Sequence, residues 1–141
     1  MEPFDYYVSG AKIGRQVPRF EAPLVSLKGH HHFSVNDALN EGAFILIFGD
    51  LDPTTFKSEV PIYHVVREEV KKIKPNLFPV IADTSLEIAE SFGVLNEKSG
   101  LFIPSIFGIK ASGQLGFKLE GLDLKALDQS LFKTLIESLN R

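Results

Sequence analysis

The chain of 141 residues contains no cysteine. Disulfide reductases, disulfide isomerases and thiol peroxidases all attack through a thiolate, which serine, threonine or phenylalanine cannot replace at neutral pH without an activating base. The sequence therefore excludes thiol chemistry. A domain of this length buries roughly two thirds of the surface that its unfolded chain exposes, so it can fold without disulfide bonds or a structural metal.

Long hydrophobic runs and clusters of basic residues are also missing. No apolar stretch approaches the roughly 20 residues that cross a bilayer. The formal net charge is -3 and the Lys and Arg residues are scattered, whereas phosphate binding needs a clustered basic surface. We therefore expect neither a membrane nor a nucleic acid as partner. The N-terminus lacks the basic start and apolar core of a signal peptide, which indicates the cytoplasm unless an exported precursor was trimmed.

The sequence contains no GxSxG, GxxxxGK or HExxH motif, so nothing in it indicates a hydrolase, a nucleotide enzyme or a cofactor. Three consecutive histidines, His30 to His32, form a cluster of metal-ligating residue types, and Asp50 with Asp52 could also bind a cation. Neighbouring side chains of a strand point to opposite faces, so at most His30 and His32 could share an ion. We expect no metal and no cofactor.

The order of elements predicts one domain over residues 1–141, with an irregular segment at 1–11. The apolar run at 43–48 lies between two glycines, which is typical of a strand buried on both faces near the centre of a sheet. Further expected elements are a hairpin around Lys28 and Gly29, a short helix from Ser34 or Asn36 to Leu39, a strand at 77–83, a helix capped by Thr84 or Ser85, strands at 103–109 and 115–120, and a last helix at about 123–139.

Residues 55–72 are predicted to form a long helix. Apolar side chains recur there at helical spacing, while most charged residues take the other side; the apolar positions are Val60, Tyr63, Val66, Val70 and Ile73. Pro61 is expected to bend this helix. Strand, helix and strand, followed by a hairpin and a terminal helix, predict a three-layer α/β sandwich with a central mixed sheet.

Three stretches resemble thioredoxin-like proteins of the AhpC/TSA and TlpA/ResA-like type: IGRQVPRFEAPLVSLKG, FILIFGDLDPTTFKSEVP and FIPSIFGIKASGQLGFKLEG. They are similar to that family's start before the first hairpin, its strand with the CxxC loop and helix start, and its cis-proline strand with the closing strand. The resemblance implies a thioredoxin-like fold with an N-terminal hairpin extension, a helix that begins near Thr55, and a cis bond before Pro104.

The chain differs from the family at the positions of the family's catalytic residues. The two CxxC positions fall on Pro53 and Phe56, and the position of the family's buried carboxylate is Ile47. No arginine lies near Pro104, where peroxiredoxins hold the peroxide. The resemblance therefore implies an oxidoreductase scaffold without its catalytic residues, and whether the protein is an enzyme stays open, with a non-enzymatic role favoured.

In the family's fold, the start of the helix and the peptide before the proline face each other. Such a face can accept an extended peptide or an anion. We expect it to bind a protein, a peptide or a second copy of the chain, and the expected binding residues are Pro53, Thr54, Thr55, Phe56, Ile103 and Pro104. Phe102 and Phe107 are expected to extend this face as an apolar patch. The alternative is that Pro104 serves packing only and Phe56 caps the core.

Two other functions stay open. The stretch HFSVNDALNEGAFILIFGD is similar to the start of the dimerising thioredoxin-like C-terminal domain of FAD-dependent aromatic hydroxylases, which implies a dimer without flavin chemistry. That family has an R-P-D-G turn where this chain has 110–113, KASG. The other alternative is an enzyme with a cysteine-free mechanism that uses Asp50, Asp52 or His64, although an aspartate pair in an Asp-Pro turn is more typical of caps.

Overall fold

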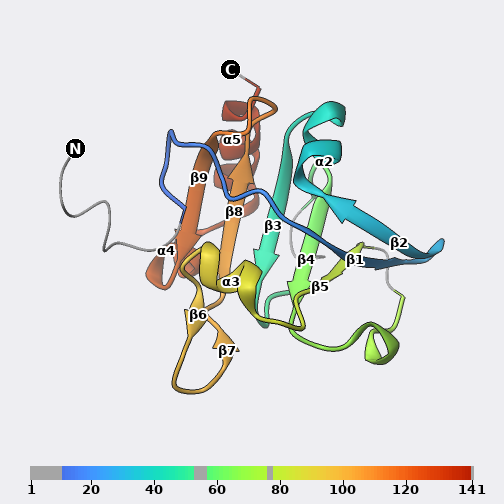
Figure 1. Cartoon of the computed structure of the whole chain (residues 1–141). Coiled ribbons are helices and arrows are strands. Elements are labelled where there is room, and N and C mark those ends of the chain that lie inside the picture. Colours follow the sequence, from blue (N-terminus) through green and yellow to red (C-terminus); the bar gives the residue numbers. More distant parts are fainter. Residues whose placement is uncertain (1–10, 53–56, 76–77, 141) are drawn as a thin grey trace.

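The computed structural model describes residues 11–52, 57–75 and 78–140. A seven-stranded mixed sheet forms the middle of the molecule, with the strand order β2-β1-β5-β4-β3-β8-β9 (Figure 1). The strands are β1 (Glu21–Ser26), β2 (Gly29–Ser34), β3 (Phe44–Phe48), β4 (Ile62–Val66), β5 (Val80–Ala82), β8 (Ser105–Ile109) and β9 (Leu115–Glu120). A separate small hairpin consists of β6 (Leu95–Asn96) and β7 (Leu101–Phe102).

The helical elements are α2 (Val35–Glu41), the 3-10 turn η2 (Val70–Lys72), α3 (Glu87–Ser91), α4 (Leu122–Ala126) and α5 (Gln129–Ser138). Helices cover both faces of the sheet. One face packs against α2 and α3, and the other against α5. This arrangement confirms the predicted three-layer sandwich with a mixed sheet. The β1–β2 hairpin joins the sheet through antiparallel pairing with β5, which confirms the N-terminal hairpin extension.

The directions of the strands decide where a site can form. β3 runs parallel to β4, and β4 runs parallel to β5, whereas β8 and β1 are antiparallel to the strands beside them. The carboxyl ends of β3, β4 and β5 therefore meet at one edge of the sheet. In open α/β sheets, ligands usually bind outside this edge.

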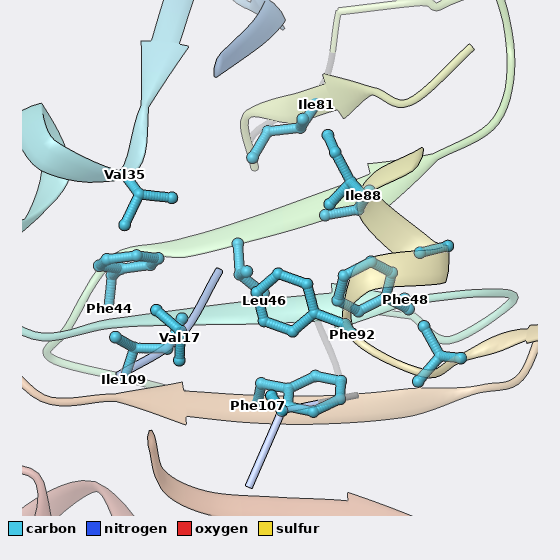
Figure 2. Close-up of a cluster of buried hydrophobic side chains, with 14 of the residues drawn as sticks. Val17, Val35, Phe44, Leu46, Phe48, Ile81, Ile88, Phe92, Phe107 and Ile109 are labelled. Carbon is cyan, nitrogen blue, oxygen red and sulfur yellow. The ribbon is translucent and has the colours of Figure 1, made fainter. Parts of the chain in front are cut away.

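β3 is buried along its whole length, as its apolar run predicts. Successive side chains point to opposite faces, so Leu46 and Phe48 enter the core beneath α2 and α3, while Ile45 and Ile47 enter the core beneath α5. Figure 2 shows the first of these cores, in which Phe48 lies with Phe92 of the chain after α3 and with Phe107 of β8.

The expected exposure of Phe107 is wrong. Its side chain is fully buried, and its ring lies 5.5 Å from Phe48 and 5.1 Å from Phe92, centroid to centroid, in edge-to-face geometry. Phe107 belongs to the core because β8 is an inner strand that packs on both faces. Phe102 is half-buried and contacts the same core from β7.

The predicted helix at 55–72 is also wrong, because residues 62–66 form the central strand β4. The sequence IYHVV pairs with β3 on one side and β5 on the other. A strand buried on both faces carries apolar residues at every position, and some of them then fall at helical spacing by coincidence. All five residues are aromatic, imidazole-bearing or β-branched, and a sheet accommodates such side chains.

The connection from β3 to β4 covers only residues 49–61, and its described parts, 49–52 and 57–61, contain no helix. The expected helix start near Thr55 lies outside the described residues. Leu51 and Val60 pack against the core beneath α5. The described parts of the connection thus lie on the face of the sheet that α5 covers.

The ends of the helices follow capping chemistry. Ser34 caps α2 by accepting a hydrogen bond from the Asp37 N–H at 3.0 Å, as expected. The expected Thr84 or Ser85 cap of α3 is right only in part: Ser85 Oγ accepts a hydrogen bond from the Glu87 N–H at 3.4 Å, but Leu86 occupies the N-cap position and the Asp83 carboxylate accepts from Ile88 and Ala89. The last helix is divided into α4 and α5, because Asp128 leaves the helical conformation and caps α5.

Candidate functional site

A groove of about 440 Å³ lies at the carboxyl ends of β3 and β4. Its lining residues come from the ends of both strands and from the β6–β7 hairpin, and they are Gly49, Asp50, His64, Val65, Val66, Arg67, Glu68, Leu101, Phe102 and Pro104. In Figure 1 the hairpin projects beyond the end of the sheet, with β7 on the side of β4. The groove therefore lies where the topology predicts a ligand site.

Gly49 ends β3 and packs directly against Pro104. Its φ of +85° is one that residues with a side chain rarely adopt, and a Cβ added to it would lie 3.0 Å from the Pro104 Cα. Both the backbone conformation and the close approach require glycine here. The peptide bond between Ile103 and Pro104 is trans, so the expected cis bond is wrong.

His64 of β4 fixes the turn after β3. Its Nε2 lies 2.7 Å from the Gly49 carbonyl oxygen. A carbonyl oxygen only accepts hydrogen bonds, so Nε2 carries the proton, and in the neutral ring Nδ1 is an acceptor. His64 is half-buried. The imidazole therefore holds the Gly49 backbone against Pro104, which is a structural role at the base of the groove.

A hydrogen bond also joins the two walls of the groove. Arg67, which follows β4, donates a hydrogen bond from Nη1 to the Gly100 carbonyl oxygen at 3.1 Å. This bond ties the β6–β7 hairpin to the end of β4. The turn of the hairpin is ordered by Asn96, whose Oδ1 accepts from the Lys98 N–H at 3.1 Å.

The hairpin wall exposes apolar side chains. Leu101 is 51% exposed and Ile103 is 39% exposed, and Pro104 beside them is also exposed. Single exposed apolar residues are common on soluble proteins and need no explanation. Three within four consecutive residues, at the rim of a groove, form the kind of patch that protein interfaces use.

The expected site residues divide into two groups. Pro104 lines this groove and Ile103 is exposed beside it without lining it, whereas Pro53, Thr54, Thr55 and Phe56 lie outside the described residues. Asp50 and His64, which were considered for a cysteine-free mechanism, both line the groove. Asp52 is exposed in the connection after β3 and has an interaction partner.

Sequence reasoning missed Arg67, Glu68 and Leu101. The first two fell within the wrongly predicted helix, and Leu101 fell just before the strand predicted at 103–109. A signal was present, because IYHVV is rich in β-branched and aromatic residues and is followed at once by charged residues, as at the end of a strand.

A larger groove of about 560 Å³ lies between residues 18–23 and the start of α3, and Asp83 is among its lining residues. Burial raises the pKa of the Asp83 carboxyl, and the N–H groups of Ala89 and Ile88 partly oppose this. Asp83 Oδ1 accepts from the Ile88 N–H at 3.1 Å, and Oδ2 accepts from the Ala89 N–H at 2.8 Å. The carboxylate is thus engaged in capping α3.

Metal ligation finds no support in the parts of the chain that the structure describes, where no group of three or more His, Asp or Glu residues could hold an ion. His32 makes a hydrogen bond of 3.0 Å to Glu21 instead. Among these residues, no helix has the length and apolar character needed to cross a membrane.

No protein-family model matches the chain, and no curated protein matches its sequence. Solved structures do match. Enterococcus faecalis AhpC is similar with 20% identity and a TM-score of 0.71, over 91% of this chain and 92% of that one. Plasmodium yoelii thioredoxin peroxidase I is similar with 19% identity and a TM-score of 0.70, over 90% of this chain and 88% of that one.

A third similar structure is the mitochondrial 2-Cys peroxiredoxin of Plasmodium falciparum, with 13% identity and a TM-score of 0.68, over 90% of this chain and 92% of that one. Structural similarity at identities this low shows the fold, but it gives no evidence that this chain shares the activity of those proteins. The chain therefore has the thioredoxin-like fold of peroxiredoxins and AhpC, without a cysteine to perform their chemistry.

Proposed function

We propose that this protein is a redox-inactive binding module that takes an extended segment of a protein partner into the groove at the carboxyl ends of β3 and β4. The observation that carries the proposal is the exposure of Leu101 on the wall of that groove, with Ile103 exposed between the lining residues Phe102 and Pro104. The absence of cysteine removes thiol chemistry but leaves the groove in place.

The residues that follow β3 complete the proposed face. Pro53, Thr54, Thr55 and Phe56 continue the chain from Asp50, which lines the groove. We include them in the binding face together with Ile103 and Pro104. The partner is proposed to be a protein or a peptide, and the compartment to be the cytoplasm.

Selection from a display library of random peptides tests this function without a known partner. Purified wild-type protein should enrich a family of related peptides, because a groove with fixed apolar walls selects particular side chains. Leu101→Asp should abolish the enrichment, since a carboxylate on that wall would lose its water when a peptide covers it. Phe56→Asp tests the other part of the face in the same way.

The matched control is Leu131→Asp. Leu131 is 40% exposed, on α5 and outside the groove, so this variant should enrich the same peptides as the wild type. Circular dichroism and thermal melting establish that all variants are folded. Failure of the wild type to enrich any family, or enrichment of the same family by Leu101→Asp, would overturn the proposal.

A second copy of the chain is the alternative occupant of this face. Sedimentation velocity over a range of concentrations distinguishes it, because a self-associating protein sediments faster as its concentration rises. A monomer at every concentration also argues against a relative of the dimerising hydroxylase domain. Asp50 and His64 both line the groove, but within the described residues their arrangement does not favour a cysteine-free enzyme.

A further inference from the structure

Leu27 lies in the turn of the β1–β2 hairpin, and its apolar side chain is 64% exposed. The hairpin projects from one end of the molecule, where β2 is the outermost strand of the sheet (Figure 1). Lys28 follows Leu27 in the turn and is also exposed. The tip of the hairpin therefore combines an apolar side chain with a cation.

The fold places further cations at the same end. β1 pairs with β5, and η2, which precedes β5 in the chain, lies beside β1 (Figure 1). Three exposed lysines come from η2 and from the chain just after it, and they are Lys71, Lys72 and Lys74. Lys28 lies far from these three in the sequence, so only folding brings the four cations to one end of the molecule.

Most of these cations are not neutralised by the protein. Lys71 lies 3.5 Å from the Glu69 carboxylate, whereas no ion pair of the described residues engages Lys28, Lys72 or Lys74. The whole chain has a net charge of -3. Positive charge is thus concentrated at one end of an acidic protein, and none of these lysines lines the groove at β3 and β4.

We propose that this end, formed by Leu27, Lys28, Lys71, Lys72 and Lys74, binds the surface of an anionic lipid bilayer. The lysines lie at the lipid headgroups, and Leu27 enters the boundary between headgroups and acyl chains. Membrane surfaces that carry anionic lipids, such as the cytoplasmic leaflet, attract clusters of basic residues, and a buried apolar side chain strengthens the association.

The exposed leucine favours a bilayer over a nucleic acid, because a phosphate backbone offers no apolar layer for it. Surface binding needs no membrane-spanning helix, so it agrees with the absence of one among the described residues. The inference is independent of the peptide-binding function proposed for the groove.

Three histidines extend this basic end along β2. His30 to His32 are exposed, and a strand rises about 3.3 Å per residue, so they lie within about 10 Å of the turn. Histidine side chains gain positive charge as the pH falls from about 8 to 5. The carboxylates on the elements that pack against β2 are Glu21 of β1, which lies 3.0 Å from His32 Nε2, and Asp37 and Glu41 of α2.

Sedimentation of the full chain with lipid vesicles tests the proposal. Vesicles of phosphatidylcholine alone are compared with vesicles that also contain about 30% phosphatidylserine, at about pH 7.5 and about 0.1 M salt. The protein should bind the anionic vesicles about tenfold more tightly or better, and about 0.5 M salt should remove most of this difference. Equal binding to both kinds of vesicle, or binding to neither, would overturn the proposal.

Lys71→Glu with Lys72→Glu should weaken binding to the anionic vesicles about tenfold, since two attractive charges become repulsive. The matched control is Lys125→Glu with Lys133→Glu, which changes the net charge equally at exposed positions of α4 and α5 and should bind like the wild type. Circular dichroism establishes that both variants are folded. Equal losses would show that net charge alone decides adsorption, and would overturn the proposal.

Leu27→Trp reports insertion directly, because the chain contains no tryptophan. Its fluorescence should shift to shorter wavelength when anionic vesicles are added, as the indole moves from water into the membrane interface. Leu131→Trp is the control, at a position on α5 that is 40% exposed, and its fluorescence should not shift. An unshifted spectrum of Leu27→Trp under conditions in which this variant sediments with vesicles would contradict the proposed insertion.

Two further measurements separate the histidines and the competing ligand. Lowering the pH to about 5.5 should tighten binding to anionic vesicles, and the combination of His30→Gln, His31→Gln and His32→Gln should remove this gain. A gain that survives in the triple variant would overturn the part assigned to the histidines. Binding of a single-stranded oligonucleotide more tightly than of anionic vesicles, lost in Lys71→Glu with Lys72→Glu, would assign the lysines to nucleic acid and overturn the membrane proposal.

Discussion

The side-chain amide of Gln129 pairs with the backbone of Lys57. The Lys57 N–H donates to Gln129 Oε1 at 3.0 Å, and Gln129 Nε2 donates to the Lys57 carbonyl oxygen at 3.2 Å. One amide side chain thereby satisfies both backbone groups of a residue that belongs to no helix or strand. These two bonds attach the β3–β4 connection to the start of α5.

Gln129→Leu is expected to lower the free energy of unfolding by about 1 kcal/mol. The two hydrogen bonds are exposed, so water replaces them in part, and each contributes at the low end of the usual range. Urea denaturation measures the change. The control is Lys133→Met, one turn later on α5 and equally exposed. An unchanged midpoint for Gln129→Leu would show that the amide pair does not hold the connection.

Gly49→Ala is expected to destabilise the protein more than Gly14→Ala. The two glycines have nearly the same φ, +85° and +84°, so alanine is disfavoured equally at both. A Cβ at Gly14 meets nothing within 4 Å, whereas at Gly49 it lies 3.0 Å from the Pro104 backbone. We expect about 1 kcal/mol for Gly14→Ala and about 2 to 3 kcal/mol for Gly49→Ala.

Thermal or urea unfolding of both variants checks this prediction. Equal losses would mean that the backbone of Pro104 moves away at little cost, and that the base of the groove is deformable. A larger loss at Gly49 would support a preformed groove, since His64 also holds this residue through its carbonyl oxygen.

Phe107→Ala is expected to cost about 3 to 5 kcal/mol of stability, as for other fully buried phenylalanines. Its ring contacts Phe48 and Phe92, and no part of it reaches the solvent. Phe102→Ala should cost less than half as much, because Phe102 is half-buried. Similar losses in urea denaturation would contradict the burial that separates these two residues.

Much of the fold was predictable because its signals are local. The apolar run at 43–48 between two glycines identified β3, and Gly29 and Gly113 marked the turns of two hairpins. β4 was not predictable by periodicity, because a strand inside a sheet has apolar side chains on both faces and matches a helical pattern as well. Only its pairing with β3 and β5 distinguishes the two.

The candidate site was predictable in part for a topological reason. Residues that follow parallel strands meet at one edge, and Asp50, which follows β3, lines the candidate groove there. Arg67 and Glu68 follow a strand that was mistaken for a helix, so their position at this edge of the sheet was not predicted. The close contact of Gly49 with Pro104 depends on a long-range approach that sequence spacing does not encode.

Asp83 gives the protein a pH-dependent contribution to stability. Burial raises the pKa of its carboxyl in the folded state, and the nearby Glu87 adds to the rise, while the hydrogen bonds from Ala89 and Ile88 oppose it. Between the pKa of the unfolded chain, about 4, and the higher pKa of the folded protein, the folded state binds more protons. The free energy of unfolding therefore falls as pH rises through this window.

Comparison with Asp83→Asn isolates this contribution, because asparagine does not titrate. The stability of the wild type minus that of Asp83→Asn should be largest below about pH 4 and should decrease as the pH rises through the folded pKa. Urea denaturation at a series of pH values measures the difference, with Asp123→Asn as the control for the lost net charge. A difference that grows with pH would mean that the two N–H donors outweigh burial, and that the capping bonds of α3 favour the charged carboxylate.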